Sequence, residues 1–491
     1  MDHKNLLRVS AIFCLVLSSC GKIKSTATEP LLDQSPSPFA SATPPSTPTS
    51  TPVAFLDYPE YNLQLDLDYT QKSAQVEESI HYQNQSGGDL TSIVLAVEPN
   101  LWAGCFALKE IRINGLSINT FRLEGQRLEL TRDLSPLEIV TISIDYSLTI
   151  PWIEVDNHAT IIRTQVFGYT PRQLNLVDWY PFVVPYEPGK GWILNEPATY
   201  GEHLVYGSAN FEVSVHFSGS DSPPIVAASG EEIPAAEGKH YQLLKGRSFA
   251  FSFSPDYLIK SQEQDGVNVL SYYYPSNALA GQAALDATLR ALQVFSQDFS
   301  AYPHPTLSIV QEETAFSMEY DGLYFLERPL YFGYSGVETD VLPSIAAHET
   351  AHQWWFALVG TNQAYEPWLD ESLSTYSERL FNESYGTDKG NWWYLWRISL
   401  AKEKDCPVDI SIYGFYGYNC FYTESVYMRG ALFLQALRDR LGDEVFLGFL
   451  KDFATQYTHQ IASTQDFFNV LRQHSETDLT DILHEFFQNP Y

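Results

Sequence analysis

The folded part of the chain shows two successive patterns of hydrophobic and polar positions. From Tyr58 to about Asp256, short runs such as Tyr61–Leu67 and Ile139–Ile144 alternate apolar and polar residues, and Gly, Asn, Asp and Pro separate the runs. A period of two places every second side chain on the same face of a strand. This region is therefore predicted to be antiparallel β-structure.

After Tyr257 the spacing of apolar residues becomes mostly that of helices. Strands are expected at Val267–Tyr274, Thr306–Gln311 and Leu323–Leu326. Helices are expected over about Ala278–Phe299, Val341–Leu358, Glu371–Tyr385, Trp392–Ala401, Glu424–Leu441, Asp443–Tyr457, Thr464–His474 and Leu479–Phe487. The expected fold class is multidomain α+β, with an antiparallel β domain over residues 56–256 and a mainly helical domain over residues 257–491.

The N-terminal segment fits neither pattern. Basic residues precede the apolar run Ala11–Leu17, which is too short to span a bilayer and leads into Leu17-Ser18-Ser19-Cys20. This tetrapeptide resembles the lipobox of bacterial lipoproteins, so residues 1–20 are expected to be a signal peptide with Cys20 as the lipid attachment site. A plain secretory signal with an incidental cysteine is the alternative.

Residues 21–55 are rich in Pro, Ser and Thr and are expected to form a disordered linker. With a lipid on Cys20, the linker would tether an extracytoplasmic domain to the membrane at the bacterial cell surface. The remaining cysteines outside the signal are Cys105, Cys406 and Cys420. Either Cys406 and Cys420 form a disulfide and Cys105 is a buried free thiol, or all three are free.

The charge of the chain excludes one class of partner. Its 491 residues include 29 Lys and Arg against 60 Asp and Glu, a formal net charge of −31. Nucleic acids are bound through basic surfaces, so no nucleic-acid partner is expected. A monomer is assumed.

Two histidines are the first residues in the sequence that indicate a chemical function. His348 and His352 are four residues apart inside an apolar helical pattern. Four residues make about one helical turn, so both imidazoles project from one face and can bind one metal ion. Glu349, about 100° further round the helix, is expected beside that ion, where it can take a proton from water and give it to a leaving amine.

A catalytic zinc ion usually has three protein ligands and an open position for water. The candidates for the third ligand are Asp370 and Glu371, in Trp368-Leu369-Asp370-Glu371-Ser372. Glu371 is expected to open a second helix that is antiparallel to the first. It is preferred over Asp370 because its side chain is longer.

The block from His348 to Glu371 is similar to the zinc motif of the aminopeptidase N family, which is H-E-x-x-H, eighteen residues and a glutamate. The resemblance implies a thermolysin-like zinc peptidase domain over residues 257–491. It also implies one zinc ion per chain, bound by His348, His352 and Glu371, with Glu349 as general base. A short member without the large C-terminal helical domain of longer members is expected.

Two further segments match this family. Tyr427 stands where the family has the tyrosine of its Y-x-x-G segment, and the resemblance implies that its phenol hydrogen-bonds the oxyanion. Residues 316–320 occupy the place of the G-x-M-E-N motif, so Glu319 is implied to bind the α-amine of the substrate. Phe316 and Tyr320 depart from that motif. For the family's second amine anchor, Gln173 is the candidate, one position out of register.

The sequence therefore predicts a zinc-dependent metallopeptidase that binds peptide substrates, with aminopeptidase action preferred. A zinc endopeptidase is one alternative. A non-catalytic peptide-binding protein on the same fold is another, suggested by Phe316 and Tyr320 and opposed by the intact Glu349 and Tyr427.

Overall fold

The computed structural model describes residues 55–155, 166–219, 222–399, 406–415, 421–489 and 491. The predicted signal peptide, Cys20 and almost all of the linker lie outside the described residues, and so does Cys420. Among the described residues, none belongs to a helix that is both long and apolar enough to cross a membrane.

The largest sheet of the N-terminal β region has eight strands in the order β16-β17-β14-β1-β2-β8-β4-β5. Every second residue of β1 is buried, as the alternation predicted. The ladder between β1 and β14 is parallel, which departs from the prediction, and the long connection between the two strands permits it. The strands are β1 (Glu60–Asp68), β2 (Ser73–Gln83), β4 (Phe106–Ile113), β5 (Leu116–Ser117), β8 (Ile139–Thr149), β14 (Ala209–Ser218), β16 (Glu231–Ile233) and β17 (Lys239–Gly246).

Two four-stranded sheets and a two-stranded ribbon complete this region, in the orders β15-β18-β10-β9, β11-β3-β7-β6 and β12-β13. Their inward residues share one hydrophobic core with the large sheet, and Cys105 lies in that core as a buried free thiol. The elements are β3 (Leu90–Ala96), η1 (Glu98–Leu101), β6 (Phe121–Glu124), β7 (Arg127–Leu134), β9 (Gly168–Tyr169), β10 (Leu174–Leu176), β11 (Phe182–Val183), β12 (Tyr186–Glu187), β13 (Gly191–Trp192), β15 (Ile225–Ala228) and β18 (Phe251–Ser254).

A five-stranded sheet in the order β19-β20-β21-β23-β22 opens the second half of the chain. Strands β20, β21 and β23 run parallel, and β22 is antiparallel to β23 at the edge. The strands are β19 (Leu258–Gln264), β20 (Val267–Tyr273), β21 (Thr306–Gln311), β22 (Met318–Tyr320) and β23 (Leu323–Leu326). The three strands predicted here are confirmed.

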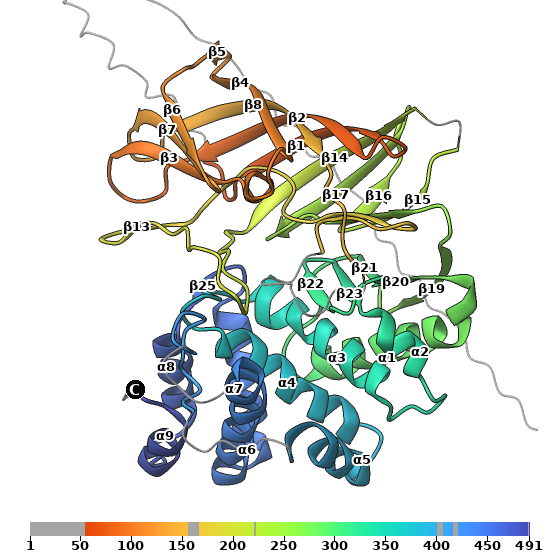
Figure 1. Cartoon of the computed structure of the whole chain (residues 1–491). Helices are drawn as coiled ribbons and strands as arrows, with labels where there is room; N and C mark the ends of the chain where they lie inside the picture. Colours follow the sequence, from red (N-terminus) through yellow and green to blue (C-terminus); the bar gives the residue numbers. More distant parts are fainter. Residues whose placement is uncertain (1–54, 156–165, 220–221, 400–405, 416–420, 490) are drawn as a thin grey trace, which may run out of the picture. The chain divides into compact units, whose positions relative to one another are not determined.

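Helices make up most of the rest of the chain, drawn from green to blue in Figure 1. They are η2 (Pro275–Asn277), α1 (Ala278–Asp298), α2 (Arg328–Gly333), α3 (Val341–His352), η3 (Gln353–Leu358), α4 (Trp368–Glu383), α5 (Thr387–Trp393), η4 (Tyr394–Ile398), η6 (Thr423–Arg429), α6 (Gly430–Leu441), α7 (Asp443–Gln456), α8 (Thr464–His474) and α9 (Thr480–Phe486). A short parallel pair joins β24 (Gly360–Thr361) to β25 (Ile461–Ala462). The predicted fold class, a β region followed by a mainly helical domain, is confirmed.

Helices α3 and α4 pack against each other and form the frame of the site. Asp340 caps α3 by accepting a hydrogen bond from the backbone N–H of Val341. Helix α4 begins at Trp368, earlier than predicted, so Glu371 lies within its first turn rather than at its start. The buried indole of Trp368 packs against aromatic rings of α6 and α8 and fixes this end of the helix.

Candidate metal centre and peptide cleft

His348 and His352 on α3 converge with Glu371 on α4. The two Nε2 atoms are 3.1 Å apart, and Glu371 Oε2 lies 3.3 Å from the first and 3.5 Å from the second. All three side chains are buried, and Glu371 Oε2 has no hydrogen-bond partner among the described residues. A buried carboxylate oxygen without a partner is costly unless a cation joins it. Two imidazole nitrogens and one such oxygen suit zinc.

Each histidine is held through its other ring nitrogen. His352 Nδ1 lies 2.6 Å from Asp370 Oδ1, and Asp370 Oδ2 accepts a hydrogen bond from Gln363 Nε2 at 2.7 Å. His348 Nδ1 lies 2.9 Å from Oε1 of the fully buried Glu378. A carboxylate at Nδ1 keeps the proton there and leaves the Nε2 lone pair for a metal. Asp370, the rival third ligand, thus lies behind His352 and not among the converging atoms.

Glu349 and Tyr427 flank the three ligand candidates. The carboxyl group of Glu349 is buried, Oε2 has no hydrogen-bond partner in the described part of the chain, and burial raises its pKa to about 7. A group with a pKa near neutral can both accept and return a proton. Tyr427, from η6, stacks on His348 with ring centroids 5.9 Å apart, and its hydroxyl donates to Glu371 Oε1.

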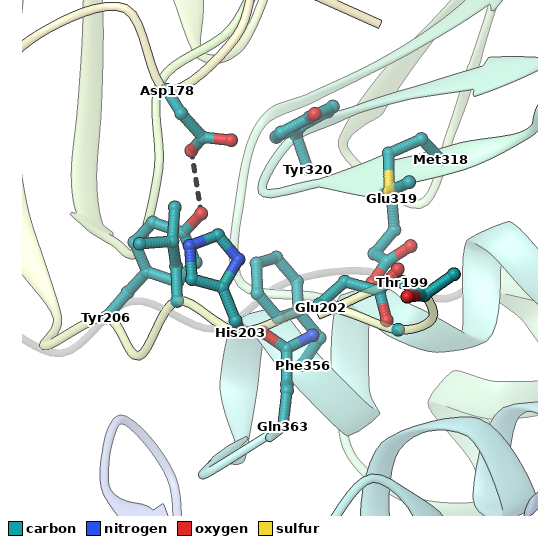
Figure 2. Close-up of a pocket in the computed structure, with 12 residues that line it drawn as sticks. Asp178, Thr199, Glu202, His203, Tyr206, Met318, Glu319, Tyr320, Phe356 and Gln363 are labelled. Carbon is teal, nitrogen blue, oxygen red and sulfur yellow. Dashed lines mark hydrogen bonds between the residues drawn. The ribbon is translucent and has the colours of Figure 1, made fainter. Parts of the chain in front are cut away.

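Glu319, on the edge strand β22, is 7% exposed. A carboxylate oxygen of Glu319 lies within 4.8 Å of potential ligand atoms of Glu349 and His352. Burial raises the pKa of Glu319 well above its ordinary value, and the Glu202 carboxylate adds to the rise. Phe316 lines the same cleft as the metal-ligand candidates, whereas Tyr320 lines a separate cavity behind Glu319 (Figure 2).

Glu202 was missed by the sequence reasoning. It lies in the segment before β14 and points toward Glu319, and both line the cleft and the cavity behind it (Figure 2). Burial, then the charges of Glu371 and Asp370, raise the pKa of Glu202 to about 8. No motif surrounds it. The one sign of a special backbone conformation in the sequence was the preceding Gly201, and in the structure this glycine has φ +72°.

The loop that carries Glu202 is fixed by a buried polar network. His203 Nε2 lies 3.4 Å from Glu98 Oε2 and 3.0 Å from Gln126 Oε1, both in the β region. Asn195 Nδ2 donates to the backbone oxygen of His203 and to Asn362 Oδ1, each at 3.0 Å. The β region therefore positions Glu202 against residues of the helical domain.

Gln173, the predicted second amine anchor, lies away from the cleft. Its side chain is fully buried, and Nε2 donates to the hydroxyl of Tyr257 at 2.6 Å and to the backbone oxygen of Gln311 at 3.1 Å. Its Oε1 accepts from the backbone N–H of Glu313 at 3.0 Å. Because this side chain already binds the protein core, the interpretation of Gln173 as an amine anchor is wrong.

The cleft in front of the ligand candidates has a volume of about 330 Å³. Its walls bear five carboxyl groups and one guanidinium group, in addition to the two imidazoles. The charged residues are Glu202, Glu319, Glu327, Glu349, Glu371 and Arg397. Arg397 lies on η4. Cys406, which comes later in the chain, is disulfide-bonded.

Comparisons with known proteins agree with this geometry. Residues 283–486 match the peptidase family M1 domain. Aminopeptidase M1-B of Oryza sativa subsp. japonica is 26% identical over 239 residues, which are 46% of this chain and 27% of the relative. The mitochondrial aminopeptidase 2 of Saccharomyces cerevisiae is 24% identical over 235 residues, 44% of this chain and 24% of the relative. The chain thus spans about a quarter of the length of these curated relatives.

Solved structures match over a larger share of the chain. The M1 zinc metallopeptidase from Deinococcus radiodurans has a TM-score of 0.60 at 19% identity and covers 89% of this chain and 96% of its own. A variant of that protein bound to a Tyr-Ser-Ala substrate has a TM-score of 0.62 at 19% identity and covers 89% of this chain and 95% of its own. Residues 283–486 thus match a peptidase family M1 domain, and the solved M1 zinc metallopeptidase structures share the fold of the chain.

Proposed function

We propose that the protein is a zinc-dependent aminopeptidase that binds one zinc ion per chain and hydrolyses the N-terminal peptide bond of its substrates. The observation that carries this proposal is the pair of carboxyl groups, Glu202 and Glu319, that face each other beside the metal-ligand candidates. Two neighbouring carboxylates repel each other, and burial adds to the cost of ionising both. A substrate ammonium between them would relieve both costs.

The space behind this pair favours removal of single N-terminal residues over cleavage at internal bonds. The cavity beyond Glu202 and Glu319 has a volume of about 80 Å³. This volume is about a quarter of that of the cleft in front of the ligand candidates, so the space behind the pair offers less room for further residues of a peptide. An internal bond placed at the metal would require the chain to continue past Glu202 and Glu319 into this smaller space, so the proposal prefers aminopeptidase action, with endopeptidase action as the alternative outcome of the test below.

The chain's own residues have separate roles in this proposal. His348, His352 and Glu371 would hold zinc, which when bound polarises the peptide carbonyl and acidifies water. Glu349 accepts the proton of the attacking water and transfers it to the leaving amine. Tyr427 donates a hydrogen bond to the oxyanion as the carbonyl becomes tetrahedral, and this bond is stronger in the transition state than in the ground state.

Mass spectrometry of one peptide with a free and with an N-acetylated terminus tests the proposal. We expect stepwise loss of N-terminal residues from the free peptide and no cleavage of the acetylated one. Glu349→Gln should keep its zinc and lose hydrolysis, whereas the exposed Glu338→Gln should behave as wild type. Equal internal cleavage of both peptides would refute the aminopeptidase proposal and support an endopeptidase.

A second test concerns the ligand set and the non-catalytic alternative. Elemental analysis of purified protein should give one zinc per chain, and His348→Ala or Glu371→Ala should lose it. If wild type and Glu349→Gln bind peptides equally and neither hydrolyses any of a broad panel, the protein is a peptide-binding protein.

We also propose that the protein is anchored to the membrane by a lipid on Cys20 and acts outside the cytoplasm. The basis is the lipobox-like Leu17-Ser18-Ser19-Cys20 and the Pro-rich segment after it. Acyl chains contribute about 0.8 kcal/mol for each buried CH₂, so two or more chains anchor a protein stably. Detergent-phase partitioning should be lost in Cys20→Ser. Aqueous partitioning of the processed wild type would indicate a plain secretory signal.

A further inference from the structure

We propose that Arg397 binds the C-terminal carboxylate of the substrate, so that the enzyme prefers dipeptides and tripeptides with a free C-terminus. This inference rests on the proposed aminopeptidase function, because it requires the peptide to have its N-terminus at Glu202 and Glu319. It adds a length limit and a requirement for a negative charge at the other end of the substrate.

Arg397 and the carboxylate pair are connected to different histidines of the ligand set. Glu319 and Glu202 act electrostatically on His352 and its neighbours, and a carboxylate oxygen of Glu319 is within 4.8 Å of a ring nitrogen of His352. Arg397 is linked instead to His348, because Glu378 Oε1 lies 2.9 Å from His348 Nδ1 and 3.1 Å from Arg397 Nη2. A peptide bound across the two histidines therefore has carboxylates at its amino end and a guanidinium at its other end.

The separation between Arg397 and the metal-ligand candidates suits a short peptide. The Arg397 guanidinium carbon lies 5.9 Å from the ring centroid of Tyr427, and the same ring lies 5.9 Å from that of His348. The side chain of Tyr427 thus lies near both Arg397 and His348. Each residue of extended peptide adds about 3.5 Å, so the carboxylate of a dipeptide or tripeptide falls within this range. The cleft volume of about 330 Å³ also lies at the small end of ligand sites.

The guanidinium group retains donors for a ligand. Its Nε and Nη2 both donate to one oxygen of Glu378, Oε1, at 3.2 and 3.1 Å. An arginine has five N–H donors, and the bonds to Glu378 hold the planar group in one orientation. The side chain is 19% exposed and lines the cleft. Arg397 is therefore both fixed and accessible from the substrate side.

The charges that line the cleft make Arg397 important for the binding of a free C-terminal carboxylate. Among the described residues that line the cleft, Arg397 is the one Lys or Arg, against five carboxyl groups. The whole chain has a formal net charge of −31. A peptide that ends in a carboxylate close to the metal is repelled by this field unless a positive group faces it. An amidated or longer peptide has no such charge at that position.

A purely structural role is the competing explanation. Glu378 is fully buried, and Arg397 supplies a guanidinium partner, next to His348 and the indole N–H of Trp393. In that case the loss of Arg397 would weaken zinc binding or folding and would affect all substrates alike. The test must therefore compare two substrates that differ only at the C-terminus.

The experiment measures kcat/KM for matched di- and tripeptides as free acids and as C-terminal amides. The wild type should prefer the acids by about tenfold or more, as expected for a charge-assisted hydrogen bond. Arg397→Gln should abolish this ratio, and Arg397→Lys should keep part of it, since Lys retains the charge without the planar fork. Arg379→Gln is the matched control, because Arg379 also pairs with a glutamate of α4, at 17% exposure, outside the cleft.

Binding provides a readout that is independent of turnover. In the Glu349→Gln background, calorimetry should show tighter binding of the acid than of the amide, and adding Arg397→Gln should remove the difference. Arg397→Gln also leaves the buried Glu378 without its guanidinium partner and should lower the melting temperature, so the ratio between acid and amide is the readout. Equal kcat/KM for acids and amides in the wild type would overturn the inference and leave the aminopeptidase proposal intact. A ratio unchanged in Arg397→Gln would also overturn it. If no free-amine substrate is hydrolysed, the proposed function itself fails.

Discussion

Asp370→Asn tests how far the zinc site depends on the groups behind its ligands. Asp370 Oδ1 lies 2.6 Å from His352 Nδ1 in a region where Asp370 is 1% exposed. Asparagine has nearly the same shape and can still accept a hydrogen bond from Nδ1, but it lacks the negative charge that makes the imidazole a stronger donor to the metal. Losing such a partner costs about 10- to 100-fold in metal affinity, equivalent to about 1.4–2.7 kcal/mol.

The assay is a zinc titration of the metal-free protein against a competing chelator. Asp409→Asn is the control, since Asp409 is also buried and hydrogen-bonded, to the backbone N–H of Gln488 at 2.9 Å, but it lies outside the cleft. Its zinc affinity should equal that of wild type. An affinity for Asp370→Asn equal to wild type would refute the reasoning about charge. Complete loss of zinc, as in His348→Ala, would mean that Asp370 is itself a ligand.

Three further variants test other parts of the structure. Tyr427→Phe should lower kcat about 10²-fold or more in steady-state assays while KM changes little, because the proposed oxyanion donor is removed. The variant also loses the hydrogen bond to Glu371 Oε1, so its zinc content is measured in parallel. Gly201→Ala places a Cβ 2.6 Å from Ile412 at φ +72°, so the displaced Glu202 should raise KM for free-amine substrates without changing zinc content. Glu78 is 2% exposed, neither of its carboxylate oxygens has a hydrogen-bond partner in the described part of the chain, and burial raises its pKa above 4.5. As pH rises above that value the unfolded chain loses this proton first, so Glu78 alone should lower wild-type stability by up to about 1.4 kcal/mol per pH unit, and denaturation of Glu78→Gln should show a slope that is smaller by this amount.

The metal-ligand candidates were predictable because they depend on local geometry. Helical spacing alone places His348 and His352 on one face, and the first turn of a neighbouring helix brings in Glu371. The choice between Asp370 and Glu371 needed the packing of α3 against α4, which decides which carboxylate meets Nε2 and which meets Nδ1.

The other end of the cleft was not predictable. Glu202 is brought to Glu319 by a loop that follows a long irregular stretch of the β region, and no periodic pattern spans that distance. Gln173 had the right residue type near an expected position, but its side chain fills the core between the β region and β21. Sequence spacing gives no information on contacts of this kind, because tertiary packing determines them.

The buried network around His203 has a consequence for how such an enzyme can be altered. Glu98 and Gln126 hold the loop of Glu202 from the β region, whereas the zinc-binding helices have a separate core. Under the proposed function, changes in that loop can therefore alter how the amino end of a peptide is held while the metal-ligand candidates stay in place. Under the proposed function, one of the two carboxyl groups for the amino end of the peptide, Glu202, is held by the β region, whereas the other, Glu319, lies in the same half of the chain as the metal-ligand candidates. Selection or protein engineering can therefore vary the first without rebuilding the second.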